Sequence, residues 1–422
     1  MDEARHTDRM DKSVTINWSQ NWLRKKVVQQ LDLLKGGQIT LQDPVGLMTL
    51  GEESSELNVK LDIKDIGFYQ QVAMHGSIGA AESYMQGEWE VDCLTKLIRL
   101  FVLNRDLLDD MESGTAMIKN SILKIWHLLN KNNHTGSRKN IAAHYDLGNK
   151  FFELFLDKHL MYSSAIYTPE ANDLESASDL KLKTICEKLD LSADDNLVEI
   201  GTGWGGLAIY AAKNYGCKVT TTTISEQQYQ YAKQRIEQEN LQDQITLLKE
   251  DYRDLQGKFD KLVSIEMIEA VGHHYLDTYL KQCSHLLKPK GLGLIQAITI
   301  EDSRYKQALK SVDFIKRYIF PGSFIPCVSA VVDSAGKGTD MRLINLEDFG
   351  ESYAYTLRDW RLKFMENLEE VRAQGFNEAF IKMWEFYLCY CEGGFLEKAI
   401  SDVHLLFAKP ANGREQWLNL KS

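Results

Sequence analysis

Apolar and polar residues follow two different patterns along the chain. In the N-terminal part, an apolar stripe at helical spacing is followed by segments in which apolar and polar residues alternate, which is typical of half-buried strands. The predicted elements are a helix that begins at 22–28 and is ended by Gly36 and Gly37, strands at 38–41 and 57–63, and two helices within 76–104 that a turn at Gly87 separates. We therefore predict a small α+β domain over residues 1–115.

From about residue 180 onward, short apolar strands alternate with amphipathic helices. The predicted strands are 197–200, 218–224, 245–249, 259–265 and 291–300, and the predicted helices are 207–214, 226–239 and 274–287. Such alternation predicts an α/β fold with an open, doubly wound, mostly parallel sheet covered by helices on both faces. We assign residues 141–422 to this domain and residues 116–140 to a linker helix, whose apolar stripe and basic residues suit either packing on the core or contact with anionic lipid.

Composition and charge narrow the functional classes. The chain of 422 residues carries a formal charge of −11, which argues against wholesale nucleic-acid binding because phosphate contacts need a basic surface. No apolar run is long enough to span a bilayer, and the charged N-terminus does not resemble a secretory signal. The seven cysteines are scattered, which predicts neither a metal site nor a disulfide framework. We expect a cytoplasmic protein that binds no metal and no nucleic acid.

A glycine-rich segment, Val-Glu-Ile-Gly-Thr-Gly-Trp-Gly-Gly-Leu at 198–207, follows the first strand of the predicted sheet. Glycines at the end of a strand let the backbone approach a ligand, and the next helix offers free N–H groups. The spacing of Gly201, Gly203 and a third glycine can be aligned to a dinucleotide fingerprint, so an oxidoreductase is an alternative. However, the acid at Glu199 and the bulky Trp204 favour a sulfonium amino acid over a pyrophosphate.

Residues that follow the next two strands fit the same ligand. Thr223, Ile224 and Gln228 lie in a segment whose hydroxyls and amides can bind a ribose diol. Asp251 can accept a hydrogen bond from the exocyclic amine of an adenine, and Tyr252 can stack on its ring. We therefore predict S-adenosylmethionine as the cofactor and a class I methyltransferase domain.

The fourth strand is followed by the string Ser-Ile-Glu-Met-Ile-Glu-Ala-Val-Gly-His-His at 264–274. It lacks the Asn/Asp-Pro-Pro-aromatic signature that is common in methyltransferases of amides and bases, which argues for another kind of acceptor. Glu269 follows an apolar pair, and an ionised carboxylate in an apolar pocket is costly unless it is partnered. Glu269 is therefore either functional or an acid at a helix start that faces solvent.

Several strings, taken in order, resemble the cyclopropane-fatty-acyl-phospholipid synthase family. They are residues 140–167 (NIAAHYDLGNKFFELFLDKHLMYSSAIY), the glycine-rich segment, 250–255 (EDYRDL), 264–275, 314–326 (FIKRYIFPGSFIP) and the aromatic C-terminal helices. The resemblance runs nearly continuously from about 138 to 410, and residues 76–104 resemble the N-terminal domain of longer bacterial members. It implies methyl transfer from S-adenosylmethionine to the cis double bond of an unsaturated acyl chain of a membrane phospholipid, which forms a cyclopropane ring through a carbocation-like intermediate.

The resemblance also implies roles for individual residues and a bound bicarbonate ion that acts as the base. The cofactor-binding residues would be Tyr162, Ser163, Gly201, Thr202, Gly203, Thr223, Ile224, Gln228, Tyr252 and Ile265. Bicarbonate would be held by Ser164, Glu269, Gln296, the backbone of Ile298, and Tyr353. The family usually has cysteine at the position of Ser164 and histidine at that of Gln296. Because glutamine cannot become cationic, the anion site is either weakened or tuned to a different fate of the intermediate.

The expected chemistry calls for dry, aromatic surroundings, because water would destroy a carbocation. The candidate lining residues are Tyr318, Phe320, Tyr353, Trp360, Phe364, Trp384, Phe386 and Tyr387, of which we expect two or three to line the site. Two alternatives stay open beside the oxidoreductase: the same transfer ending in a methyl-branched or methylene lipid, and a non-catalytic lipid- or nucleotide-binding module. The expected partner is an unsaturated phospholipid at the inner face of the membrane, to which the protein would bind peripherally, and a homodimer is left open.

Overall fold

The computed structural model of the chain describes residues 16–53, 56–107 and 147–414. By its internal contacts the chain divides into two units, Met1–Met117 and Ile118–Ser422. The linker helix predicted at 116–140 lies outside the described residues. Each unit has its own sheet and is described by itself.

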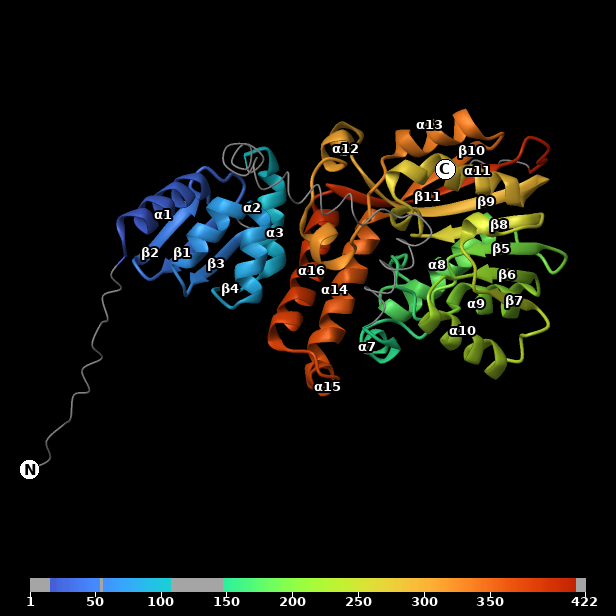
Figure 1. The fold of residues 1–422 in the computed structure, drawn as a ribbon, viewed down its shortest axis with the longest axis horizontal. Coiled ribbons are helices and arrows are strands. Elements are labelled where there is room, and N and C mark those ends of the chain that lie inside the picture. Colours follow the sequence, from blue (N-terminus) through green and yellow to red (C-terminus); the bar gives the residue numbers. More distant parts are fainter. Residues whose placement is uncertain (1–15, 54–55, 108–146, 415–422) are drawn as a thin grey trace, which may run out of the picture. The chain divides into compact units, whose positions relative to one another are not determined.

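The N-terminal unit is built on a four-stranded sheet in the order β2-β1-β3-β4 (Figure 1). Its elements are α1 (Trp18–Leu31), β1 (Gln38–Asp43), β2 (Gly46–Gly51), β3 (Asn58–Ile63), α2 (Gly67–Met85), β4 (Trp89–Val91) and α3 (Leu94–Leu103). Along β3, buried and exposed residues alternate, as the sequence pattern predicts. A buried ion pair of Arg24 with Asp43 (2.6 Å), to which the Tyr69 hydroxyl also donates, joins α1, β1 and α2.

The second unit contains a seven-stranded sheet in the order β10-β11-β9-β8-β5-β6-β7. Its strands are β5 (Asn196–Ile200), β6 (Lys218–Thr222), β7 (Ile245–Leu248), β8 (Phe259–Ile265), β9 (Leu287–Ile300), β10 (Arg342–Asp348) and β11 (Ile400–Ala408). The pairs among β5 to β9 are parallel, and β11 runs antiparallel to both β9 and β10. The mostly parallel sheet confirms the predicted α/β class.

Helices cover this sheet and extend beyond it (Figure 1). They are α7 (Asn149–Glu153), α8 (Leu174–Lys188), α9 (Gly206–Tyr215), α10 (Glu226–Gln238), α11 (Leu276–Leu286), α12 (Asp302–Ala308), α13 (Val328–Gly338), α14 (Gly350–Glu366), α15 (Leu368–Ala373) and α16 (Glu378–Leu396). Short helical turns are η1 (Tyr252–Asp254), η2 (Ile268–Ala270), η3 (His273–Tyr275) and η4 (Ile315–Ile319). The long helices α14 and α16 pack side by side as an addition to the doubly wound core.

Successive residues of the central strands enter opposite cores. Leu197 of β5 packs with α8 and α9, whereas the next residue, Val198, packs with α11. In β9, Leu294 likewise belongs to the core that contains Leu197, and Ile295 belongs to the core that contains Val198. Because side chains alternate across a strand, a sheet buried on both faces needs continuous apolar runs, which is the pattern that predicts these strands.

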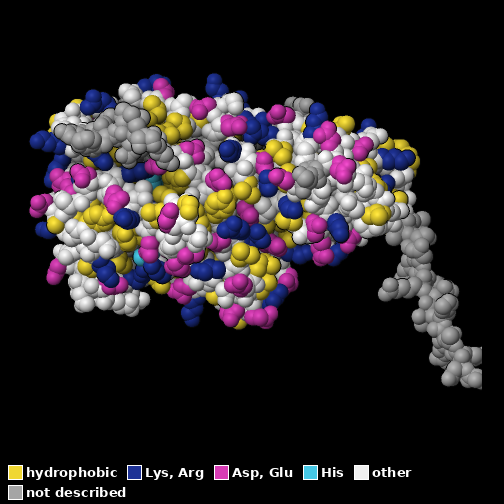
Figure 2. Space-filling model, turned by 180° about the vertical axis from the view of Figure 1, so that it is seen from behind, with side chains coloured by type: hydrophobic (Ala, Val, Ile, Leu, Met, Phe, Trp, Pro, Cys, Tyr) yellow, Lys and Arg dark blue, Asp and Glu magenta, His cyan; other side chains and the backbone are white. Residues whose placement is uncertain are grey.

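On the face shown in Figure 2, Lys and Arg side chains are interspersed with Asp and Glu side chains, and hydrophobic side chains lie among them. No helix in the described ranges combines the length and the apolar character that a membrane span requires.

Candidate functional site

The glycine-rich loop turns directly out of β5 toward α9. Gly201, Gly203 and Gly205 have φ values of +100°, +52° and +86°, which side chains with a Cβ rarely adopt. The N–H groups of Gly201 and Thr202 donate to the Thr222 carbonyl (3.1 and 3.0 Å), which fixes the loop to the end of β6. The predicted glycines thus shape a tight turn at the carboxyl edge of the sheet, where ligands of such folds bind.

Beneath the loop lies a buried chain of polar side chains. The Thr221 hydroxyl donates to the Glu199 carboxylate (2.5 Å), and the hydroxyls of Thr221 and Thr202 are 2.7 Å apart. Burial raises the pKa of Glu199 to about 8, because the ionised form loses its hydration. The Thr202 hydroxyl is thus engaged under the loop, and its backbone N–H and carbonyl are engaged with Thr222 and Gly205, so Thr202 shapes the loop.

The residues predicted to hold the ribose come together after β6. The Thr223 hydroxyl donates to Oε1 of Gln228 (3.0 Å), and both side chains are buried, while Ile224 is partly buried. The residues predicted for the adenine are already engaged within the chain. The Asp251 carboxylate pairs with Arg253 (2.6 Å), the Tyr252 ring packs edge-on against Tyr279, and Ile265 is partly buried at the end of β8.

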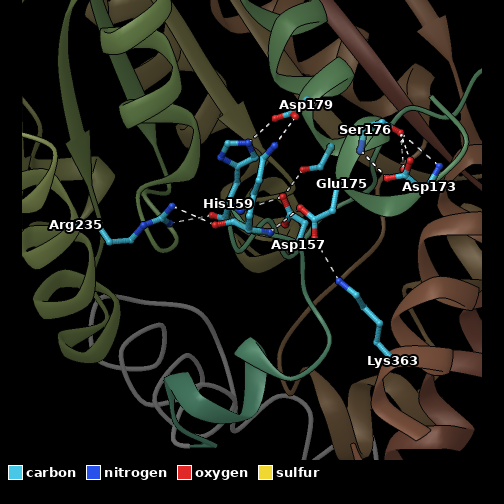
Figure 3. A network of polar contacts seen from close by, with 10 residues as sticks. Asp157, His159, Asp173, Glu175, Ser176, Asp179, Arg235 and Lys363 are labelled. Carbon is cyan, nitrogen blue, oxygen red and sulfur yellow. Dashed lines mark hydrogen bonds and ion pairs between the residues drawn. The ribbon is translucent and has the colours of Figure 1, made fainter. Parts of the chain in front are cut away.

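The segment that carries Tyr162, Ser163 and Ser164 is held in place by the polar network drawn in Figure 3. The Asp157 carboxylate accepts the N–H groups of His159 (3.1 Å) and Met161 (2.7 Å). Nε2 of His159 lies 2.6 Å from Asp179 of α8. Arg235 of α10 donates to the carbonyl of His159 at 3.0 Å (Figure 3). It also donates to the carbonyl of Trp204 at 3.0 Å. Arg235 therefore ties this segment to the glycine-rich loop.

Tyr162 contacts two of the predicted aromatic residues, whereas Ser163 contacts Lys181, which the sequence reasoning did not single out. The Tyr162 hydroxyl is 2.9 Å from that of Tyr387, and its ring stacks on Trp360 with the centroids 5.3 Å apart. The Ser163 hydroxyl accepts from Nζ of Lys181 (2.7 Å), which is fully buried in α8. Burial lowers the pKa of Lys181, while Glu266, Asp157 and Asp402 favour its charged form.

Three of the donors predicted for bicarbonate converge on a side chain of the protein itself, Glu266. Oε1 of Glu266 accepts the backbone N–H of Ser164 (2.8 Å) and Nε2 of Gln296 (2.8 Å). Oε2 accepts the hydroxyl of Tyr353 (2.6 Å). Glu266 was not predicted as a site residue, although it stands three positions before Glu269.

The fourth donor predicted for bicarbonate, the backbone N–H of Ile298, also binds a carboxylate of the chain. The backbone N–H of Ile298 donates to Oε1 of Glu269 (2.6 Å), and Oε2 of Glu269 is sealed from solvent with no partner in the described part of the chain. Glu269 therefore points inward, so the solvent-facing alternative is wrong. Because all four donors bind carboxylates of the chain, the residues present do not fit a bicarbonate ion at the predicted position.

The orientation of Gln296 follows from its neighbours. The Lys188 ammonium, 2.9 Å from Nδ1 of His404, can only donate, so the imidazole proton belongs on Nε2. Nε2 of His404 in turn lies 3.3 Å from Oε1 of Gln296, and the two residues pair across β11 and β9. Burial and the lysines lower the pKa of His404 well below its ordinary value, so the ring is neutral. The amide nitrogen of Gln296 must then face the acids.

A third acid, Asp402, completes the cluster. Its Oδ2 accepts from Nε2 of Gln296 (2.8 Å), and its Oδ1 has no partner among the residues described. Burial and the neighbouring Glu266 charge raise the pKa of both Asp402 and Glu269 well above ordinary carboxyl values. Burial also raises the pKa of Glu266, but Tyr353, the Ser164 N–H and Lys181 oppose this. Of the three acids, Glu266 is therefore the one whose charge the surroundings support best.

Aromatic rings extend from this cluster. Tyr353, which donates to Glu266, stacks on Phe395 (4.5 Å) and lies edge-on to Trp360 (6.2 Å). Trp360 stacks on Tyr162, whose ring is 6.3 Å from Phe320. We call Tyr353, Trp360, Tyr162 and Phe320 the aromatic wall. Of the other predicted lining residues, Tyr387 lies 6.2 Å from Phe320, Phe364 and Trp384 pack with Phe151, and Tyr318 and Phe386 pack on Phe314.

Comparison with known proteins gives one consistent family. The family model described as mycolic acid cyclopropane synthetase matches residues 132–405. Tuberculostearic acid methyltransferase UfaA1 of Mycobacterium tuberculosis is 34% identical over 334 residues, which cover 77% of each chain. Cyclopropane-fatty-acyl-phospholipid synthase of Escherichia coli K12 is 36% identical over 351 residues, which cover 82% of this chain and 87% of that one.

Solved structures agree. The cyclopropane synthase MmaA2 from Mycobacterium tuberculosis superposes with a TM-score of 0.60 at 26% identity, over 64% of this chain and 98% of its own. The mycolic acid cyclopropane synthase CmaA1, in a complex with SAH and CTAB, gives the same values. These matches confirm the resemblance inferred from the sequence strings and the class I methyltransferase fold. The chain belongs to the mycolic acid cyclopropane synthetase family and is an S-adenosylmethionine-dependent methyltransferase.

Proposed function

We propose that the protein transfers the methyl group of S-adenosylmethionine to the cis double bond of an unsaturated acyl chain of a membrane phospholipid and closes a cyclopropane ring. The observation that carries this proposal is the aromatic wall, which begins at the buried acid cluster through Tyr353. A base beside aromatic faces suits a reaction that develops positive charge on carbon and then loses a proton.

The residues around the glycine-rich loop would hold the cofactor. When bound, S-adenosylmethionine supplies an electrophilic methyl group on a positively charged sulfur. Gly201 and Gly203 give the loop its turn, and Arg235 ties it to the segment that carries Tyr162 and Ser163. The buried Thr223–Gln228 pair offers a hydroxyl and an amide to a ribose. We keep Asp251, Tyr252 and Ile265 as expected neighbours of the adenine.

The chain's contribution to the chemistry is geometry and electrostatics. Alignment of a double bond with the reacting methyl carbon can offset roughly 7–11 kcal/mol of the barrier. The π pair of the double bond forms the new bond to the methyl carbon as the bond from that carbon to sulfur breaks and its electron pair stays on sulfur, and positive charge develops on the other alkene carbon. A ring face of Tyr162, Trp360 or Tyr353 would stabilise that charge by roughly 0.5–2 kcal/mol each. Loss of a proton from the transferred methyl group then closes the ring.

We assign no step to bicarbonate, because its predicted donors bind Glu266 and Glu269. The membrane-bound substrate makes peripheral binding at a bilayer surface part of the proposal. The cytoplasmic location, the inner membrane face and the homodimer stay predictions.

A second product class is favoured by one relative. The protein that is 34% identical is named tuberculostearic acid methyltransferase, so this kind of site also serves relatives named for methylation alone. Transfer that ends in a methylene chain uses the same first step and then loses a proton, and a saturated methyl branch would need a separate reduction of that product. The two outcomes therefore differ only in the steps after methyl transfer.

The experiment uses the purified full-length protein, S-adenosylmethionine and vesicles of a phospholipid with cis-unsaturated chains. Release of S-adenosylhomocysteine and the gain of one CH2 per acyl chain are expected, with ring-proton signals in the NMR spectrum of the extracted lipid. Vinylidene signals in place of ring signals would establish the methylene product. Vesicles of the saturated lipid are the control, and equal release on both lipids would exclude the alkene as acceptor.

A further inference from the structure

The carboxylate of Glu266 stands where an external anion was expected. Its oxygens take up the N–H of Ser164, the amide of Gln296 and the hydroxyl of Tyr353, at 2.6–2.8 Å. These donors come from a loop, from β9 and from α14, which are far apart in the sequence. The three donors form an anion-binding site, and the anion that occupies it is the carboxylate of Glu266.

The backbone holds Glu266 in an uncommon conformation. Its φ of +45° lies in the left-handed region, which residues with a Cβ avoid. The position is secured by a hydrogen bond from the Glu266 N–H to the Gln296 carbonyl (2.9 Å). Strained conformations of this kind persist where the surroundings impose them, and they cluster at functional sites.

Glu266 is also the member of the acid cluster that receives the most support as an anion. It accepts three hydrogen bonds and lies near the buried Lys181. Among the described residues, Glu269 accepts backbone N–H groups alone and Asp402 accepts one side-chain donor, and each keeps one carboxyl oxygen without a partner. One charged acid between two neutral ones is the arrangement that mutual repulsion favours.

Gln296 and Asp402 have no solvent exposure, whereas Glu266 and Glu269 are both partly exposed as whole residues. Glu266 differs from Glu269 because it accepts the hydroxyl of Tyr353. Through Tyr353 it is joined to the aromatic wall, so a substrate chain lying against Trp360 and Tyr162 would approach this carboxylate.

We propose that Glu266 is the catalytic base of this enzyme and replaces the bicarbonate ion that its family resemblance implies, an inference that rests on the proposed function. After the π pair of the alkene has bonded to the methyl carbon, a Glu266 oxygen takes one proton from that methyl group. The C–H electron pair closes the ring and neutralises the cation, and Glu266 becomes a carboxylic acid. A methylene product would form if a 1,2-hydride shift first moved the charge to the methyl-bearing carbon, and the proton would then leave the same methyl group, so the assignment holds for either fate.

The test compares wild type, Glu266→Gln and Glu266→Gly in buffer freed of carbon dioxide, with and without added bicarbonate. Wild-type turnover on unsaturated phospholipid vesicles should be the same in both buffers. Glu266→Gln keeps a hydrogen-bond acceptor but no base, so its turnover should fall about 100- to 10,000-fold. Glycine suits a φ of +45° and empties the anion site, so bicarbonate should raise the turnover of Glu266→Gly at least about tenfold. Glu187→Gln, an exposed acid of α8, is the control that should leave turnover unchanged.

Binding of 13C-labelled bicarbonate, followed by NMR, gives a readout that needs no turnover. We expect binding to Glu266→Gly and none to wild type, with thermal unfolding to verify that both are folded. The inference is overturned if wild type requires or binds bicarbonate, if Glu266→Gln keeps most of its turnover, or if folded Glu266→Gly binds none. Should wild type modify no lipid at all, the proposed function fails, while the binding arm still decides whether Glu266 fills an anion site.

Discussion

Tyr353→Phe isolates the electrostatic role of one hydroxyl at the proposed base. The substitution keeps the ring, which stacks on Phe395 at 4.5 Å, and removes the hydroxyl that donates to Glu266 at 2.6 Å. Because that bond favours the ionised form of Glu266, its loss should raise the pKa of the carboxyl. Activity that needs ionised Glu266 is then lost at a higher pH than in wild type.

The size of the shift follows from the strength of the bond. A hydrogen bond to a charged group contributes about 1.5–3 kcal/mol, and one pKa unit corresponds to about 1.4 kcal/mol. The full loss would be about 1–2 units. Since the other carboxyl oxygen keeps the Ser164 N–H and the Gln296 amide, we expect the lower end of this range, about 1 unit. On the acid limb this is a roughly tenfold lower rate, which recovers as the pH rises.

Single-turnover formation of the cyclopropane or methylene lipid, measured as a function of pH, reads out this shift, because the proton is lost after methyl transfer. Tyr167→Phe is the matched control, because the Tyr167 hydroxyl donates to Asp359 (2.8 Å) outside the acid cluster. Its acid limb should coincide with that of wild type. An acid limb that stays in place in Tyr353→Phe while the high-pH plateau falls would refute the electrostatic role and leave Tyr353 a packing residue.

Two further predictions concern the cofactor loop. Gly201→Ala should weaken S-adenosylhomocysteine binding by at least about tenfold in calorimetry, since φ is +100° and a Cβ would lie 3.2 Å from Met267; Gly375→Ala, at φ +94° with open space, should leave binding intact. Burial raises the pKa of Glu199 to about 8 from an ordinary 4.5, so the folded state keeps a proton that the unfolded state loses. That contribution to stability is complete below pH 4.5 and is lost by about 1.4 kcal/mol per pH unit as the pH rises toward 8. Glu199→Gln should remove this slope from urea unfolding, and an unchanged slope would mean that Glu199 is ionised in the fold.

The sequence predicts the parallel core of the sheet well because its signal is local. The predicted strand at 259–265 coincides with β8, and the predicted β9 is four residues short at its start. β10 and β11 were not predicted as strands. β11 carries Asp402 and His404 within an apolar run, and these polar residues can be buried because Gln296 of β9 bonds to both.

The acid cluster is harder to predict because its contacts are remote. Glu266 meets residues that are 30, 87 and 102 positions away, and its left-handed backbone is not encoded by any local pattern. A weak signal was nevertheless present, since Glu266 and Glu269 stand three apart in an otherwise apolar string. Lys181 gave a similar signal as a lone cation on the apolar face of α8.

The left-handed backbone at residue 266 has an evolutionary consequence. Codons for glutamate and glycine differ by a single nucleotide, and glycine tolerates this conformation without strain. One point mutation from glutamate to glycine can therefore replace a base that is part of the chain, the Glu266 carboxylate, with a bicarbonate ion that forms from dissolved carbon dioxide. Either substitution could occur while the surrounding hydrogen-bond donors stay the same. The residue at this position would then indicate whether the rate of lipid modification depends on the carbon dioxide concentration in the cell.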